Sequence, residues 1–294
     1  MSNNAIRTAL VAGYATVDYP VRLPQPLSGA ATATIEAIQA DRWPRPGGAA
    51  LYAGRRLAMA GYEAHACVTV GEDANGALYL DACREAGIRT AYIRRCTAVR
   101  TPWCMLLYHD NGQYTCLIDR GDVDAATHSA AGLNIAGIDL LCIAAGTPGS
   151  NAALLASVAD EAIVAWIAKR DPQSFPDWLA AGLARRSDVI FCNSSERATV
   201  EAARRSGMRS DQILIETRGA EGVRVEQGKL RFEVACDPLP VRDATGAGDT
   251  LAGEVLANLL SAGLSTKLAT SGLEFAVQRG VAAARELLQS RSAQ

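Results

Sequence analysis

The stretch that decides the fold is Val241–Leu260, VRDATGAGDTLAGEVLANLL, in which two glycines precede an aspartate that opens an apolar periodic run. From Thr250 onward, apolar residues recur at helical spacing along one face: Leu251, Val255, Leu256, Leu259 and Leu260. Gly246, Ala247 and Gly248 are therefore predicted at a helix N-terminus, where backbone N–H groups lack intrahelical partners and the dipole favours negative charge. Small residues at such a terminus let a phosphate approach closely.

Asp249 follows this turn directly and is predicted to lie in the first turn of the same helix, where the dipole keeps a carboxylate ionised. An ionised carboxylate beside an anion site can accept the proton of an attacking hydroxyl, so the pattern predicts a general base for phosphoryl transfer. Taken alone, the tetrapeptide GAGD favours a simpler interpretation, a glycine turn followed by an ordinary first-turn aspartate.

Short apolar runs alternate with helical patterns along the rest of the chain. The predicted strands are 8–13, 65–71, 138–146, 161–168, 187–193 and 212–219, and two predicted helices, each ended by a glycine, are 50–61 and 75–87. This order predicts an α/β fold with a mostly parallel central sheet flanked by helices.

Two segments interrupt the alternation. Residues 19–48 are rich in proline and show no long helical pattern, and residues 100–121 read as a hairpin with Asn111-Gly112 at its turn. We expect one domain over residues 1–294, with a small β-sheet lid built from segments at about 14–46 and 96–121.

Composition excludes several classes of protein. A net charge of −2 and scattered arginines do not predict nucleic acid as a partner. No run reaches the ~18 apolar residues of a membrane span, and the N-terminus lacks the apolar core of a signal peptide. Eight cysteines without a C-x-x-C pair favour buried, reduced thiols over a metal site. We therefore expect a cytoplasmic protein that binds neither nucleic acid nor membrane.

Two common nucleotide-binding classes lack their motifs here. A dinucleotide-dependent oxidoreductase would carry G-x-G-x-x-G after the first strand, where this chain has only Gly13. A Walker-type NTPase would carry G-x-x-x-x-G-K-[ST], which does not occur in the sequence.

The full motif DATGAGD at 243–249 resembles the signature of the ribokinase-like (PfkB) family of carbohydrate and nucleoside kinases. Three other motifs follow the family's order: PGGAALYAGRRLAMAGYEAHACVTVGEDANGALYLDACREAGI at 46–88, NSSE at 193–196 and TRG at 217–219. The resemblance spans residues 6–289. It implies a ribokinase-like fold that uses Mg-ATP to phosphorylate a hydroxyl of a small sugar, with a nucleoside as the alternative acceptor. An inactive ligand sensor on the same fold is a further alternative, which the complete turn and Asp249 disfavour.

The resemblance also implies roles for individual residues at the nucleotide end. Asp249 would be the catalytic base and Gly246, Ala247 and Gly248 the anion hole. A monovalent cation is implied near Asp243. The residues implied at the ATP site are Asn193, Glu196, Thr217, Gly219 and Thr245.

Glu196 would act on magnesium through water. Asn193 followed by Glu196 is also a capping box, which stabilises a helix without any ligand, so both interpretations stay open.

At the acceptor end, the resemblance points to Asp18, because a carboxylate can accept hydrogen bonds from two vicinal hydroxyls. The alternative for Asp18 is an ordinary turn residue before Pro20. Gly47 and Gly48 would let the chain pass close to the acceptor. Tyr52 stands where sugar kinases often have Asn, and it would either present its ring to the acceptor or pack inside the helix after Gly48.

Three further aromatic residues, Tyr14, Trp43 and Trp103, have two interpretations. They would stack on a bound base or sugar ring, or they would form the core of the lid. The family resemblance also implies a homodimer through the lid.

Overall fold

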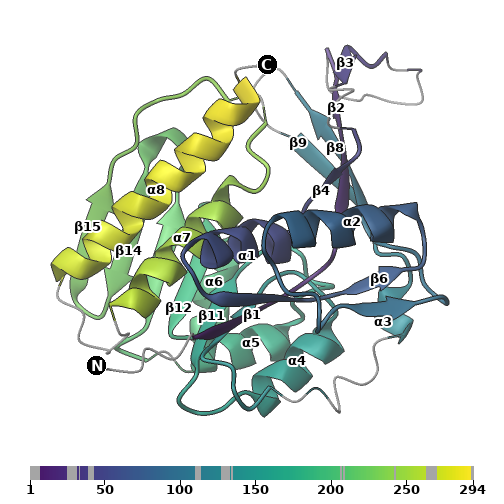
Figure 1. Ribbon diagram of the computed structural model, residues 1–294. Coiled ribbons are helices and arrows are strands. Elements are labelled where there is room, and N and C mark those ends of the chain that lie inside the picture. The colour runs from purple at the N-terminus through teal and green to yellow at the C-terminus, as the bar shows by residue number, and fades with distance from the viewer. Residues whose placement is uncertain are drawn as a thin grey trace.

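An eight-stranded sheet forms the centre of the molecule (Figure 1). The computed structural model describes residues 7–24, 32, 34–38, 43–109, 114–126, 133, 135–205, 207, 209–241, 243–262 and 270–292. The strand order is β15-β14-β13-β12-β11-β10-β1-β5, with β14 and β15 antiparallel to their neighbours and the others parallel. The bounds are β1 Thr8–Ala12, β5 Glu63–Cys67, β10 Leu140–Ile143, β11 Ile163–Ile167, β12 Val189–Asn193, β13 Ile213–Thr217, β14 Val223–Gln227 and β15 Leu230–Val234. The predicted mostly parallel sheet is confirmed.

Helices cover both faces of this sheet, and each face has its own buried apolar cluster. One cluster joins the sheet to α1 (Ala49–Met59), α2 (Ala74–Glu85), α7 (Ala247–Ser261) and α8 (Thr270–Ser292). The other joins it to α4 (Pro148–Ser157), α5 (Asp177–Arg186) and α6 (Arg197–Arg204). Two short helices complete the list: α3 (Val123–Ala126) and the 3-10 helix η2 (Gly219–Glu221). No helix in the described ranges is long and apolar enough to span a bilayer.

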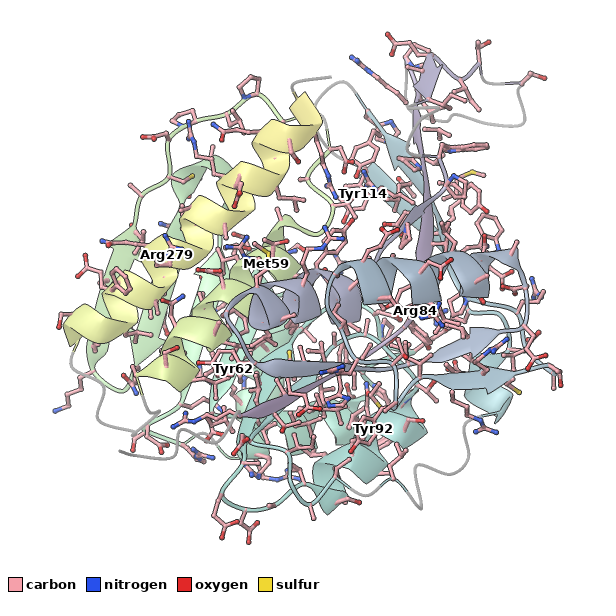
Figure 2. The ribbon with its side chains drawn as sticks, viewed as in Figure 1. Met59, Tyr62, Arg84, Tyr92, Tyr114 and Arg279 are labelled. Atoms are coloured by element: carbon pink, nitrogen blue, oxygen red, sulfur yellow. The ribbon has the colours of Figure 1, made fainter. Side chains whose placement is uncertain are left out.

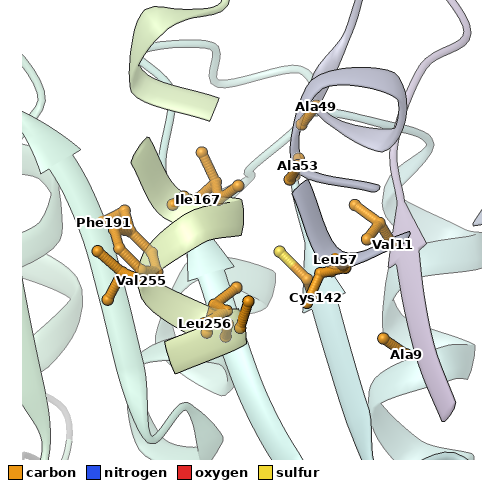
Figure 3. Close-up of a cluster of buried hydrophobic side chains, with 14 of the residues drawn as sticks. Ala9, Val11, Ala49, Ala53, Leu57, Cys142, Ile167, Phe191, Val255 and Leu256 are labelled. Carbon is orange, nitrogen blue, oxygen red and sulfur yellow. The ribbon is translucent and has the colours of Figure 1, made fainter. Parts of the chain in front are cut away.

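Close packing of α7 on α1 fixes the position of the glycine turn. Figure 3 shows Ala53 and Leu57 of α1 and Val255 and Leu256 of α7 above the strands. A Cβ atom at Gly253 would come within 2.6 Å of the Ala53 backbone, so only glycine permits this approach. The predicted apolar face of α7 is confirmed, because all five of its members are buried.

A second sheet, which we call the lid sheet, stands beside the main one (Figure 1). Its strands run in the order β3-β2-β8-β9, with β4 paired to β2. Their bounds are β2 Val17–Arg22, β3 Ala37–Ile38, β4 Arg45–Pro46, β8 Trp103–Tyr108 and β9 Tyr114–Asp119. The antiparallel pairing of β8 with β9 confirms the predicted hairpin, whose Asn111-Gly112 turn lies outside the described residues.

The prediction of one strand over 65–71 was wrong. The run divides at Val68, which belongs to neither strand: β5 stays in the main sheet, while β6 (Thr69–Gly71) pairs with β7 (Arg94–Cys96) in a separate two-stranded sheet. An apolar run shows that a segment is extended, but the pairing partner of each residue depends on contacts distant in sequence.

Candidate active site

The carboxyl end of β11 lies near the N-terminus of α7, and β12 and β13 are the next strands in the sheet. Ligands of open α/β sheets bind at such strand ends. Asn193 and Thr217 are paired in register at the ends of β12 and β13, and Glu196 and Gly219 follow within three residues. The predicted nucleotide residues thus occupy adjacent positions at one edge of the sheet.

The predicted anion-hole turn, residues Gly246–Gly248, consists of the residue before α7 and the first two residues of that helix. Gly246 is the N-cap residue and has a φ of 77°, a left-handed conformation that favours glycine. The Thr250 amide donates to the Gly246 carbonyl at 2.8 Å, which starts the helix, and Gly248 is exposed. The predicted helix N-terminus is confirmed. The Ala247 amide donates to the Ala244 carbonyl at 3.2 Å, and the other first-turn amides lack intrahelical partners, as at any helix N-terminus.

Asp249 lies in the first turn of α7 and is only 7% exposed. Its Oδ1 atom has no hydrogen-bond partner in the described part of the chain. A buried carboxylate oxygen is costly to leave without a donor, so this atom marks a position where a ligand group fits.

Lys169 was not singled out by sequence reasoning, although it faces Asp249. Its Nζ atom lies 3.9 Å from Asp249 Oδ1, and it follows β11 by two residues. The Asp249 charge raises the pKa of Lys169, burial opposes the rise, and the Glu196 charge adds to it. The available signal was its position just beyond a buried strand in a chain with only three lysines.

Asn193 and Glu196 form the capping box that was one of their two interpretations. Asn193 Oδ1 accepts the Glu196 amide at 3.0 Å, and Glu196 Oε2 accepts the Asn193 amide at 2.8 Å. Burial raises the pKa of Glu196, while the Lys169 charge and the Asn193 amide oppose the rise. The box positions the Glu196 carboxylate at the strand ends, beside Lys169.

The acceptor-end residues Asp18, Gly47 and Gly48 also come together. Asp18 lies on β2, is 3% exposed, and its Oδ2 has no partner among the described residues. A Cβ atom at Gly47 would lie 2.3 Å from that oxygen, and one at Gly48 would lie 2.6 Å from the Tyr14 carbonyl. Burial raises the pKa of Asp18 to about 6, and the nearby Arg45 opposes the rise.

Strand β9 joins the two ends of the site. Strand register places Asp18, Cys104, Tyr108, Tyr114 and Cys116 on one face of the lid sheet, which we call its inner face. A hydrogen bond with Cys104 lowers the pKa of Cys116. The Asp18 charge raises this pKa and the Lys169 charge lowers it, so Cys116 is influenced by both ends of the site. Burial raises the pKa of Tyr114, the Lys169 charge lowers it, and the Asp249 charge raises it. Figure 2 shows Tyr114 on the side of the lid hairpin that faces α8.

Tyr52 adopts the second of its two expected arrangements and packs inside the protein. It is buried in α1, and a Cβ atom at Gly246 would lie 2.5 Å from its ring. Its hydroxyl accepts a hydrogen bond from Arg291 Nη2 at 2.9 Å. Tyr52 lies on the side of α1 that packs against α7 and α8, so its ring packs against the glycine turn.

The other aromatic residues also contact protein groups. Trp43 and Trp103 meet Tyr19 edge-on, with ring centroids 5.2 Å and 5.6 Å apart, respectively. The Tyr14 hydroxyl donates to Asp124 Oδ1 at 3.0 Å. These contacts match the lid-core interpretation.

Asp243 is enclosed by donors from four parts of the chain. The Thr245 amide donates to its Oδ1 at 3.0 Å and Arg291 Nη1 donates to the same atom at 3.3 Å. The Tyr108 hydroxyl also donates to Oδ1, and Arg45 Nη1 donates to Oδ2. Thr245, predicted at the ATP site, belongs to this network.

Comparison with known proteins places this chain in a family. The model of the pfkB family carbohydrate kinases matches residues 25–294, so the chain belongs to that family and is a phosphotransferase with a hydroxyl acceptor. A search of the curated proteins finds no match.

Solved structures share the fold over nearly the whole chain. A nucleoside kinase from Methanocaldococcus jannaschii, an archaeal member of the ribokinase family, has a TM-score of 0.77 at 16% identity and covers 97% of this chain and 93% of its own. A ribokinase from Cryptococcus neoformans var. grubii serotype A, in complex with ADP, has a TM-score of 0.77 at 17% identity, with coverages of 94% and 93%. An Arabidopsis thaliana ribokinase complexed with ribose and ATP has a TM-score of 0.71 at 19% identity, with coverages of 97% and 93%. These likenesses establish a ribokinase-like fold.

Proposed function

We propose that this pfkB family member transfers the γ-phosphoryl group of ATP to a hydroxyl of a small sugar held between Asp18 and Asp249. One observation carries the proposal. Among the described residues, Asp18 Oδ2 and Asp249 Oδ1 are the only buried carboxylate oxygens without a hydrogen-bond partner. Asp18 lies on the inner face of the lid sheet, and Asp249 lies in the first turn of α7, at the other end of the site. An acceptor with several hydroxyls satisfies both atoms at once.

Asp249 is suited to act as the base. Its free Oδ1 accepts the proton of the acceptor hydroxyl as the hydroxyl oxygen forms a bond to the γ-phosphorus and the bond to the β–γ bridging oxygen breaks, releasing ADP. The amides of the turn at Gly246–Gly248 and the Lys169 ammonium stabilise the negative charge on the transferring group.

The donor and its metal fit the strand ends. Two of the solved ribokinases with this fold hold ADP or ATP, which supports ATP as the donor. Asn193, Thr217, Gly219 and Thr245 remain our proposed contacts to the nucleotide. No cluster of three His, Cys, Asp or Glu side chains suited to a metal occurs within the described ranges. Mg²⁺ would therefore be held mainly by ATP phosphates and water, with Glu196 acting through water, and it would neutralise phosphate charge.

A sugar fits better than a nucleoside as the acceptor. The aromatic side chains that were candidates for stacking on a base, Tyr14, Trp43, Tyr52 and Trp103, contact protein groups instead. Arg45 Nε and Nη2, near Asp18, are buried without partners in the described chain and can donate to hydroxyl oxygens. The fold is shared with a nucleoside kinase, so the nucleoside alternative is kept in the test.

ATP turnover and thermal shift against a panel of pentoses, hexoses and nucleosides test this function. A ligand at 100 times its Kd should stabilise the protein by about 2.7 kcal/mol. We expect turnover with a sugar. Turnover restricted to nucleosides would replace the sugar proposal, and a thermal shift without any turnover would indicate a ligand sensor.

Asp18→Asn should raise the acceptor KM about 10- to 100-fold, because hydrogen bonds to a charged group contribute about 1.5–3 kcal/mol. With a pKa of about 6, the Asp18 carboxylate is lost as the pH falls through that value, so the wild-type acceptor KM should rise below pH 6. The Asn variant should lack that pH dependence. An acceptor KM that is the same in both proteins at pH 7.5, a value at which Asp18 is ionised, would remove Asp18 from the site.

Glu196→Gln should raise the magnesium concentration needed for half-maximal rate by about tenfold, the lower end of the effect of outer-shell partners on metal affinity. Glutamine can keep the capping box with Asn193, so the melting temperature should change little. A magnesium titration of both proteins decides between the roles: an unmoved midpoint leaves Glu196 with the helix cap alone.

We further infer that the lid sheet belongs to a single kinase domain and pairs with a second copy of the chain. The support is its outer face, opposite Asp18, where Ile38 and Leu117 are 45% and 51% exposed. Sedimentation velocity should show a dimer for the wild type and a monomer for Leu117→Asp. A monomeric wild type would end this inference.

A further inference from the structure

We propose that the guanidinium groups of Arg45 and Arg291 stand where the family resemblance places a monovalent cation, and that this chain therefore works without K⁺ or Na⁺. The proposal depends on the proposed kinase function only where its tests measure activity; the tests that measure melting temperature do not depend on it. The residues around Asp243 do not fit an additional cation, for two reasons: the oxygen ligands are already engaged, and the charge is already balanced.

The oxygen atoms that an alkali cation would use accept hydrogen bonds instead. Both carboxylate oxygens of Asp243 are engaged, Oδ1 by Thr245, Tyr108 and Arg291 and Oδ2 by Arg45. Arg291 Nη1 also donates to the carbonyls of Thr245 and Asp243. A cation bound by carboxylate and carbonyl oxygens would have to displace these donors.

The charges in this region sum to zero without an added ion. Arg45 interacts electrostatically with Asp18 as well as with Asp243, so two guanidinium groups face two carboxylates. Burial would raise the pKa of Asp243, but the two arginines and the Tyr108 hydroxyl lower it to about 2, and it stays ionised at neutral pH. The side chains of Arg45 and Arg291 are only 10% and 6% exposed, so a further positive charge would be poorly screened.

The two arginines also connect the parts that carry out the reaction. Arg291, near the end of α8 beside the lid hairpin in Figure 1, binds the Thr245 carbonyl and the Tyr52 hydroxyl. Tyr52 in turn packs under Gly246 of the anion-hole turn. Arg45 lies on β4, two residues before Gly47 and paired with Asp18. Arg291 is a positioning residue, since it acts through the turn, and Arg45 positions Asp18 while its Nε and Nη2, which have no partner in the described chain, remain available to the acceptor.

The first test uses the wild-type enzyme in tetramethylammonium chloride, with KCl or NaCl substituted at a constant ionic strength of about 0.15 M, which keeps screening unchanged. We expect kcat and the ATP KM to change by less than about twofold, because an ion that does not bind the enzyme cannot shift its behaviour. The melting temperature should not depend on the cation. A rise of more than about fivefold in kcat/KM, or a melting temperature raised by K⁺ alone, would overturn the proposal.

The second test removes one fixed charge. Arg291→Ala should lose activity and regain part of it with added guanidinium or K⁺, because the gap now accepts a cation. Arg285→Ala is the matched control on the same helix, as Arg285 contacts only Asp237 among the pairs found in the described chain. We expect the control to respond to neither ion.

If Arg291→Ala is folded but inactive and neither ion restores it, the arginine does not replace a cation and the proposal falls. Should that variant fail to fold, Arg291→Lys, which keeps the charge, is expected to retain the cation independence of the wild type. An activation of the Lys variant by K⁺ would count against the proposal. If no acceptor is phosphorylated at all, the proposed function fails separately, and the melting temperatures alone decide the cation question.

Discussion

Asp249→Asn is expected to lower kcat by about 10²–10⁴-fold, the usual contribution of a general base, while ATP binding stays close to that of the wild type. Asparagine has nearly the same shape, so the first turn of α7 and the amides of the anion-hole turn should remain in place. What is lost is the ability of Oδ1, which has no partner among the described residues, to take a proton from the acceptor.

The measurement is kcat on the acceptor found in the turnover panel, together with the ATP Kd by calorimetry. Glu254→Gln is the matched control, because Glu254 is another buried carboxylate of α7 that pairs with Arg56 and Arg279 away from the strand ends. The control is expected to lose stability and to keep its kcat. If Asp249→Asn retains more than about a tenth of the wild-type kcat, Asp249 is not the general base.

Lys169→Met is expected to lower kcat by about 10²–10³-fold, the range found when one preorganised charge-stabilising group is removed. The physical reason is position: an ammonium 3.9 Å from the base lies beside the phosphoryl group during transfer. Lys169→Arg should recover part of the rate, because it keeps the charge in a different geometry.

Lys229→Met, in the exposed turn between β14 and β15, controls for the loss of a lysine. A purely structural partner of Asp249 would behave differently, since its removal would lower the melting temperature and leave kcat unchanged. In the double variant Asp249→Asn with Lys169→Met, the additional loss of kcat relative to Asp249→Asn should be smaller than the loss that Lys169→Met causes alone. The reason is that the effects of groups acting on one transition state are not additive. If the two losses of kcat multiply in full, Asp249 and Lys169 act independently and not on the same transition state.

Much of the fold follows from local patterns that need no tertiary information. The face of α7 from Leu251 to Leu260 repeats at helical spacing, and the short apolar runs mark the strands of the main sheet. The helix N-terminus at Gly246 was predictable because two glycines stand directly before an apolar periodic run, and the left-handed φ that the structure shows there suits glycine. The capping box at Asn193 and Glu196 was predictable for a similar reason, since its two hydrogen bonds join residues three apart.

The contacts that give the site its charges join residues far apart in the chain, and only the tertiary structure decided them. Lys169 meets Asp249 across 80 positions because β11 ends and α7 begins at the same edge of the sheet. Tyr52 lies under Gly246, and Arg291 reaches it from 239 positions away. Periodicity fixes which side of its own helix or strand a residue occupies. Periodicity does not show which distant side chains are buried next to that residue. For Asp243, these distant neighbours determine whether its carboxylate faces a bound ion or an arginine.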